Sequence, residues 1–226
     1  MEARVGRAAR LFHQVAHVVG RSLMIFEQVR VSGGDNFTYL VGDDGSKEAA
    51  VIDPAGAVAQ IQNLLKSHGL HLKYIINTHG HSDHTRGNRD LASDTGARIA
   101  AHVKSSVPKD MALQDGDILT VGRTQLKVLY TPGHTSDSIC IISDGHLLTG
   151  DTLFVGECGR TDLPGGDAGQ MYDSLLKISR LSDDIKVYPG HDYGSKPNST
   201  IGFEKSNNYV LKPRTRAEFI HFMSEP

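Results

Sequence analysis

Three histidines and an aspartate are crowded into six consecutive positions of this chain, within the segment THGHSDH. These residues are His79, His81, Asp83 and His84. Imidazole and carboxylate groups gain little by packing together on a turn, whereas both are good ligands for a divalent cation. Packing or chance rarely places these residue types at this spacing after a strand, so the segment predicts a metal site.

Three more polar residues follow apolar, strand-like segments in the same way. They are His134 in YTPGHTSDS, Asp151 in LLTGDTLF and His191 in VYPGHDYG. If these strands lie side by side, the loops at their carboxyl ends meet at one edge, where α/β proteins commonly build sites. A glycine precedes each of the three residues, and its missing side chain allows the backbone to approach a crowded centre. We therefore expect all seven side chains to converge.

The other polar residues carry weaker signals. Asp53, in AVIDPAG, has two interpretations: it orients a metal-binding imidazole through that ring's second nitrogen, or it caps a turn before Pro54. The remaining histidines lack a comparable context, and we expect ordinary turn or surface positions for His13, His17, His68, His71, His102, His146 and His221.

The composition limits the class of protein. The chain has 226 residues, enough for one large domain, and its net charge of -2 gives no electrostatic footprint for nucleic acid. Its two cysteines, Cys140 and Cys158, cannot form a disulfide framework, and no apolar stretch is long enough to span a membrane. These features predict a soluble cytoplasmic protein.

Strand-like and helix-like segments alternate from Met24 onward. Short apolar segments between Gly, Asp and Ser turns predict strands at residues 24–31, 36–43, 48–54, 73–77, 98–102, 116–122, 124–133, 138–143, 146–151 and 185–192. Apolar spacing and capping residues predict three helices: one from Val58 that ends at Gly69, one capped by Asp167, and one opened by the capping box Thr215–Glu218. This alternation favours a layered α/β fold with mixed sheets.

Residues 1–23 differ from the rest of the chain. They contain four arginines, one acidic residue and apolar residues at helical spacing. We predict an amphipathic extension that precedes a single domain at residues 24–226. Two alternatives are a mitochondrial targeting segment and a start codon upstream of the true one.

Together these residues resemble the motifs of the metallo-β-lactamase superfamily. The match comprises THGHSDH, His134, Asp151 and His191, with Asp53 at the position of the first conserved-motif aspartate, and it extends from Met24 to about Tyr209. The resemblance implies a four-layer αββα sandwich of two mixed sheets with helices on the outer faces. It also implies that His79, His81 and His134 bind one metal, that Asp83, His84 and His191 bind a second, and that Asp151 bridges the two.

Such a centre suits hydrolysis. Two metals about 3.5–4 Å apart hold a bridging hydroxide, because they lower the pKa of bound water toward about 7. Asp83 and Asp151 are then the candidate catalytic carboxylates. We expect two divalent ions, with zinc favoured and iron or manganese as alternatives.

Two branches of the superfamily are similar to this chain. One is the glyoxalase II group, which hydrolyses the thioester hydroxyacylglutathione. The other is the persulfide dioxygenase group, which oxidises glutathione persulfide at a single Fe(II) and which GECGRTD, GHDY and STIGFEK resemble. In that group His79, His134 and Asp151 would bind the iron, while Arg160 and Tyr193 would contact glutathione.

One position departs from the dioxygenase pattern. That group carries an Asn-Pro-Arg motif near its C-terminus, and Val210 takes the place of its arginine here, which removes a bidentate partner for a carboxylate. The chain after His191 is also too short for the added helical domain of full glyoxalase II enzymes. We rank a dinuclear hydrolase of a thioester or related acyl substrate first, an iron persulfide dioxygenase second and a non-catalytic metal-binding protein third.

A shortened chain tests the predicted extension. Residues 1–23 carry none of the candidate ligands, so a chain that begins at Met24 should keep its metal content and its turnover. Metal analysis and activity measurements on the two chains, prepared in parallel, make the comparison. Failure of the shorter chain to fold would place this segment in the core.

Overall fold

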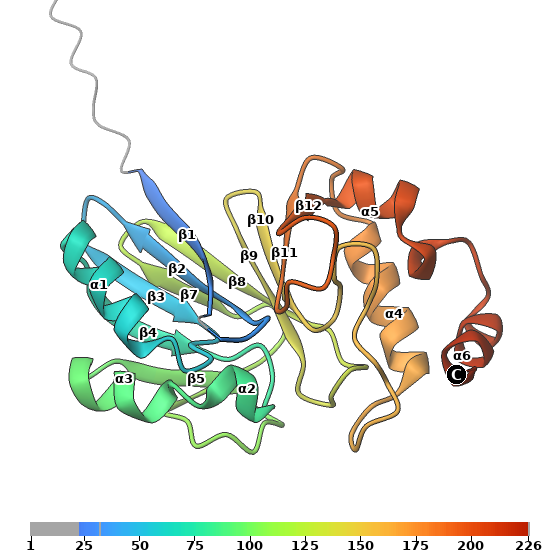
Figure 1. Cartoon of the computed structure of the whole chain (residues 1–226), viewed down its shortest axis with the longest axis horizontal. Coiled ribbons are helices and arrows are strands. Elements are labelled where there is room, and N and C mark those ends of the chain that lie inside the picture. The colour runs from blue at the N-terminus through green and yellow to red at the C-terminus, as the bar shows by residue number, and fades with distance from the viewer. Residues whose placement is uncertain (1–22, 32, 226) are drawn as a thin grey trace, which may run out of the picture.

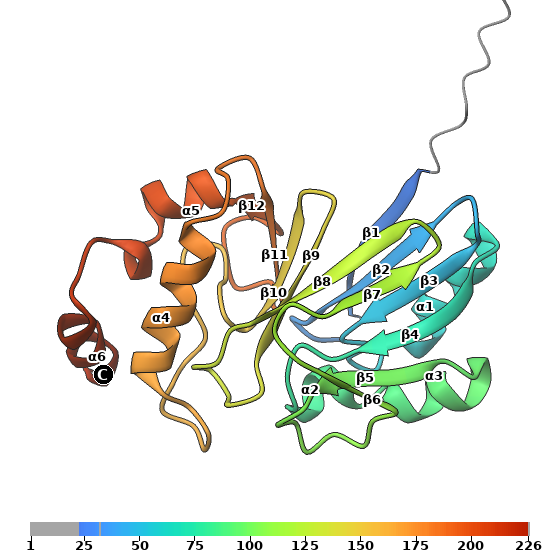
Figure 2. The same cartoon turned by 180° about the vertical axis from the view of Figure 1, so that it is seen from behind.

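Two six-stranded sheets lie face to face, and helices cover the outer face of each (Figures 1 and 2). This arrangement comes from a computed structural model that describes residues 23–31 and 33–225. The expected αββα sandwich of mixed sheets is confirmed. The expectations for residues 1–22 lie outside the described residues, and the proposed boundary at Met24 stays a prediction.

The first sheet is built from the first half of the chain, with its strands in sequence order. They are β1 (Met24–Arg30), β2 (Phe37–Asp43), β3 (Glu48–Ile52), β4 (His71–Ile76), β5 (Arg98–His102) and β6 (Met111–Leu113). The first three strands are antiparallel, and β3 to β6 are parallel. Helices on the outer face form two of the crossover connections between parallel strands: α1 (Val58–His68) connects β3 to β4, and α3 (Asn88–Thr95) lies between β4 and β5. A loop connects β5 to β6.

The second sheet uses the second half of the chain. Its strands are β7 (Ile118–Val121), β8 (Thr124–Tyr130), β9 (Ile139–Ser143), β10 (His146–Gly150), β11 (Lys186–Pro189) and β12 (Ser199–Thr200). Only β10 and β11 are parallel, and α4 (Ala168–Ser179) connects them. Three further segments complete this side: α5 (Ile201–Asn207), the 3-10 turn η1 (Tyr209–Leu211) and α6 (Arg216–Ser224).

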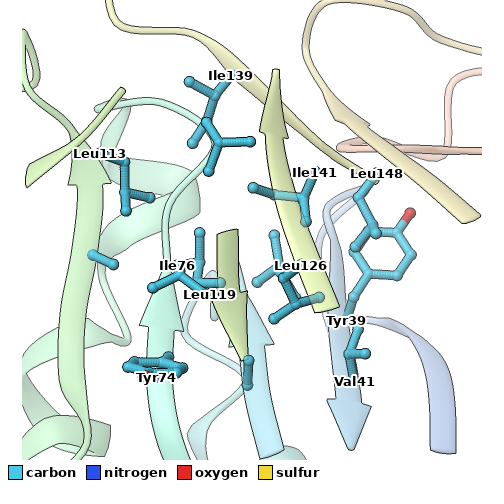
Figure 3. Packing of buried hydrophobic residues seen from close by; sticks show 14 of the residues in the cluster. Tyr39, Val41, Tyr74, Ile76, Leu113, Leu119, Leu126, Ile139, Ile141 and Leu148 are labelled. Carbon is cyan, nitrogen blue, oxygen red and sulfur yellow. The ribbon is translucent and has the colours of Figure 1, made fainter. Parts of the chain in front are cut away.

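Three apolar layers hold the sandwich together. Side chains from both sheets meet in the central layer, where Figure 3 shows Tyr39, Ile76, Leu126 and Ile141 between the facing strands. A second layer lies between the first sheet and helices α1 and α3, and a third lies between the second sheet and helices α4 to α6. Strands that are buried on both faces form near-continuous apolar runs, and every residue of β2 is buried.

The helix ends follow the sequence signals. Gly69 ends α1 in a left-handed conformation with φ of 64°, and the Asp167 side chain accepts a hydrogen bond from Gln170 N at the start of α4. The predicted capping box between Thr215 and Glu218 is present. Six elements were not predicted: α2 (Ser82–Thr85), α3, β6, β12, α5 and η1.

No helix in the described part of the chain combines the length and apolar character that crossing a bilayer requires.

The central layer predicts where substitutions destabilise the fold. Ile141 is fully buried between the sheets, so Ile141→Ala should lower the free energy of unfolding by about 2–5 kcal/mol. Ile118, on the same sheet but 51% exposed, is the matched control, and Ile118→Ala should cost far less. Urea unfolding of the metal-free proteins measures both. Equal losses would contradict this description of the core.

Candidate metal centre

All seven candidate ligands lie at one edge of the sandwich, beyond the ends of strands. His79 and His81 follow β4, and α2 carries Asp83 and His84. The other three follow strands of the second sheet: His134 after β8, Asp151 after β10 and His191 after β11. Both sheets thus contribute to the same site, as the strand-end pattern predicted.

Three imidazoles form the first group of converging donors. The ligand atoms of His79, His81 and His134 all lie within 4.8 Å of one another. His81 Nδ1 is 3.1 Å from His79 Nε2 and 3.1 Å from His134 Nε2. Nitrogens at this separation could bind the same zinc ion, whose bonds to imidazole nitrogen are about 2.0–2.1 Å long.

A carboxylate and two imidazoles form the second group. The ligand atoms of Asp83, His84 and His191 also lie within 4.8 Å of one another. The Nε2 atoms of His84 and His191 are 3.1 Å apart, and Asp83 Oδ2 lies 3.4 Å from His191 Nε2 and 3.5 Å from His84 Nε2. This mixture of nitrogen and carboxylate donors suits zinc, iron or manganese.

Asp151 lies between the two groups. Its Oδ2 is 3.5 Å from His134 Nε2 of the first group and 3.3 Å from His191 Nε2 of the second, and its Oδ1 is 3.4 Å from His84 Nε2. The side chain is buried, and Oδ1 is one of two buried side-chain atoms, among those the structure describes, that have no hydrogen-bond partner. A buried carboxylate oxygen without a donor is costly, and a cation at this position would satisfy it. The residues therefore fit bound metal ions.

Glycine at position 190 keeps space for this arrangement. A Cβ there would overlap Asp151 Oδ1 and approach His84 Cε1 to 2.9 Å. Any larger residue would displace the carboxylate that lies between the groups. The Gly-His order in VYPGHDYG is thus a packing requirement of the site.

A second layer of hydrogen bonds orients the ligands. Asp53 Oδ2 accepts from His84 Nδ1 at 3.0 Å, and the same carboxylate accepts from Thr78 N at 2.8 Å. His134 Nδ1 donates to the carbonyl oxygen of Arg160 at 2.8 Å. These bonds fix each ring so that Nε2 points into the site. Of the two interpretations of Asp53, the orienting role is the one that the structure supports.

Sequence reasoning missed Asn36, which donates from Nδ2 to Asp83 Oδ2 at 2.9 Å. It lies before β2, far from every motif, and no local pattern indicates that this loop reaches α2. Only the tertiary contact identifies it.

The two groups of donors differ in the direction in which their histidine pKa values are shifted. Burial lowers the pKa of His79 well below its usual range, and the neighbouring His84 lowers it further, which favours the neutral ring a metal needs. In the second group burial opposes protonation of His191, yet its hydrogen bonds with Asp151 and Asp83 raise its pKa to about 9. The hydrogen bond from His191 in turn lowers the pKa of Asp83. A cation entering this group displaces a shared proton, so its binding strengthens as pH rises.

An open pocket of about 320 Å³ leads to the donors. The candidate ligands His81, Asp83, His134, Asp151 and His191 line it together with Phe154, Glu157, Cys158, Gly159, Arg160, Leu163 and Tyr193. The Tyr193 ring stacks on His191, with centroids 4.6 Å apart. The Arg160 guanidinium points to solvent and pairs with Asp162, its Nε 2.7 Å from Oδ1. Both predicted substrate residues therefore line the pocket.

Val210 lies elsewhere, buried in the apolar layer beneath α4. Its side chain does not line the pocket. The dioxygenase pattern has an arginine at this position, and valine supplies no guanidinium.

The family model described as the metallo-beta-lactamase superfamily matches residues 31–191, and the chain belongs to this superfamily. Two kinds of relative share similar identity with it. A hydroxyacylglutathione hydrolase from Pelagibacter ubique is 40% identical over 170 residues, covering 73% of this chain and 70% of that protein. The mitochondrial persulfide dioxygenase ETHE1 of Homo sapiens is 38% identical over 177 residues, covering 76% and 70%.

A solved structure extends the similarity to most of the chain. The crystal structure of ETHE1 from Myxococcus xanthus superposes with a TM-score of 0.85 at 36% identity, covering 90% of this chain and 92% of that one. The relatives thus divide between hydrolase and dioxygenase at similar identity.

The cysteines provide a test of the donor set. Both are buried, and burial raises the pKa of Cys140 to about 11 and that of Cys158 to about 12, so neither supplies a thiolate near neutral pH. Replacing both with serine should leave the metal content of the purified protein unchanged, whereas His134→Ala should lower it. Elemental analysis measures both variants. Loss of metal in the serine variant would show that a thiol belongs to the donor set.

Proposed function

We propose that this protein is a hydrolase that holds two divalent metal ions, zinc in the favoured case, and cleaves a thioester such as hydroxyacylglutathione or a related small acyl substrate. One observation carries the proposal: the buried Asp151 carboxylate lies among donors of both groups, with Oδ2 3.5 Å from His134 Nε2 and 3.3 Å from His191 Nε2, and Oδ1 3.4 Å from His84 Nε2. A carboxylate placed in this way suits a bridge between two cations.

The seven candidate ligands fall into two metal-binding sets that share Asp151. One ion would be held by three imidazoles, those of His79, His81 and His134. The other would be held by Asp83, His84 and His191, and Asp151 would contact both ions. When bound, such a pair supplies an activated water molecule as the nucleophile near neutral pH.

Other residues keep the ligands and the substrate in place. Asp53 holds the Nδ1 proton of His84, which leaves Nε2 free to bind. At the pocket, the Tyr193 ring offers an apolar face, and the Arg160 guanidinium offers a bidentate partner to a substrate carboxylate in exchange for Asp162. The hydroxyacylglutathione hydrolases among the relatives support this substrate class. The two free, buried cysteines agree with a cytoplasmic location.

A mononuclear iron persulfide dioxygenase is the second candidate. The similarity to ETHE1 over almost the whole chain favours it, as does the closeness of its expected ligands, with Asp151 Oδ2 4.0 Å from His79 Nε2 and 3.5 Å from His134 Nε2. Two observations favour the hydrolase over it. The second donor group is complete, and the buried Val210 brings no guanidinium to the pocket.

A purely structural metal site ranks third. Structural sites are closed, whereas these donors line an open pocket.

Asp83→Ala separates the two enzymatic candidates. In the hydrolase it removes a ligand of the second group, so the metal content should fall from two ions per chain to one, with thioester cleavage reduced at least about 100-fold. Asp90→Ala, at an exposed aspartate on α3, is the matched control and should change neither quantity. Elemental analysis and a thioester cleavage assay provide the measurements.

The opposite result supports the dioxygenase. If Asp83→Ala holds as much metal as the parent protein and still consumes oxygen with a persulfide, the triad of His79, His134 and Asp151 is sufficient, and the hydrolase proposal is wrong.

A further inference from the structure

Asp83 differs from the other donors of the second group in its freedom to move. Its side chain is 41% exposed, whereas those of His84 and His191 are almost completely buried. It also belongs to α2, a helix of only four residues. An exposed carboxylate on so short an element gains rotamer entropy by turning to solvent, so its position in the site requires a partner.

Asn36 is one such partner, in addition to the imidazoles of His84 and His191. Its amide Nδ2 donates to Asp83 Oδ2 at 2.9 Å, and Asn36 is itself only 5% exposed. The accepting atom is the same oxygen that faces the Nε2 atoms of His84 and His191. A carboxylate oxygen has two lone pairs, so the bond from Asn36 uses one and leaves the other available to a cation.

The backbone of Asn36 is tied to another donor of the same group. Asn36 and His191 form an isolated antiparallel bridge. On either side of it, Phe37 N donates to Gly190 O at 2.8 Å, and Asp192 N donates to Asp35 O at 2.7 Å. These bonds anchor the loop before β2 to the segment that carries His191.

We propose that Asn36 is a positioning residue for the second metal position, because it holds Asp83 by its side chain and the His191 segment by its backbone. This inference rests on the proposed two-metal function, since it assigns Asn36 to the group formed by Asp83, His84 and His191. Within the described part of the chain, Asn36 contacts Asp83 and His191 and makes no hydrogen bond to His79, His81 or His134, so the first group should not depend on it.

Zinc titration of the metal-free protein tests this role without measuring activity. The parent protein should show two binding events by isothermal titration calorimetry. Asn36→Leu keeps the branched shape of the side chain, with larger methyl groups, but removes the donor. One of the two events should then lose about 10–100-fold in affinity while the other changes less than about twofold. Asn36→Ala repeats the loss of the donor without the bulk of leucine.

Asn88→Leu is the matched control. Asn88 is similarly buried, at 6% exposed, and its amide pairs with Asn77 rather than with a ligand. Both zinc affinities should survive this substitution, and thermal unfolding of each metal-free variant reports any loss of fold separately.

The outcomes are distinct. Two events of parental affinity in both Asn36 variants overturn the positioning role and leave the proposed function standing. Equal weakening of both events in the Asn36 variants, matched by Asn88→Leu, assigns Asn36 to general stability and also overturns it. A parent protein with a single binding event overturns the two-metal function and this inference with it.

Discussion

The Asp151 carboxylate is buried among four imidazoles, and the arrangement of the whole candidate metal centre depends on this burial. The nitrogens of His79, His84, His134 and His191 lie 3.3–4.0 Å from its oxygens. Removing a carboxylate from water costs several kcal/mol unless opposite charge compensates it. The Asp151 carboxylate raises the pKa of His84 and of His191, so these two rings can carry that charge while no cation is bound. Because the rings present nitrogen lone pairs to the same space, cations between them would satisfy both the carboxylate and the rings.

The sandwich makes this burial feasible. Two sheets that face each other bring the ends of β4, β8, β10 and β11 to one edge, and each strand is fixed by an apolar layer on both sides. The donors therefore come from short loops on a rigid frame, which keeps them converged without relying on a cation for the overall fold. Hydrogen bonds that Asp53 and the Arg160 carbonyl accept, and one that Asn36 donates, then set the orientation of individual side chains.

The sequence predicted the parts of this arrangement that are encoded locally. The His-x-His-x-Asp-His segment and the Gly-His and Gly-Asp pairs after apolar strands are visible in short stretches, so the donors could be named before their positions were known. The elements that it missed lack such a signal. Helix α3 buries only Asn88 and Leu91, which gives no clear apolar period, and β12 has two residues.

The remaining features depend on tertiary contacts, which the sequence alone does not reveal. The sequence left the role of Asp53 open, and the approach of His84 Nδ1 to its carboxylate distinguishes the two interpretations. Glu204 on α5 is fully buried and accepts from Gly156 N and Asn208 Nδ2, a network between segments far apart in the chain that no spacing rule predicts. The pairing of Arg160 with Asp162 likewise depends on side-chain conformation.

We expect Asp151 to lie between two cations. Anomalous diffraction from crystals of the protein, purified without added metal and measured at the absorption edges of zinc, iron and manganese, tests it most directly. We expect two peaks about 3.5–4 Å apart, one beside each group of donors, with the Asp151 carboxylate between them. A single iron peak held by His79, His134 and Asp151, with no second peak near Asp83, would contradict it.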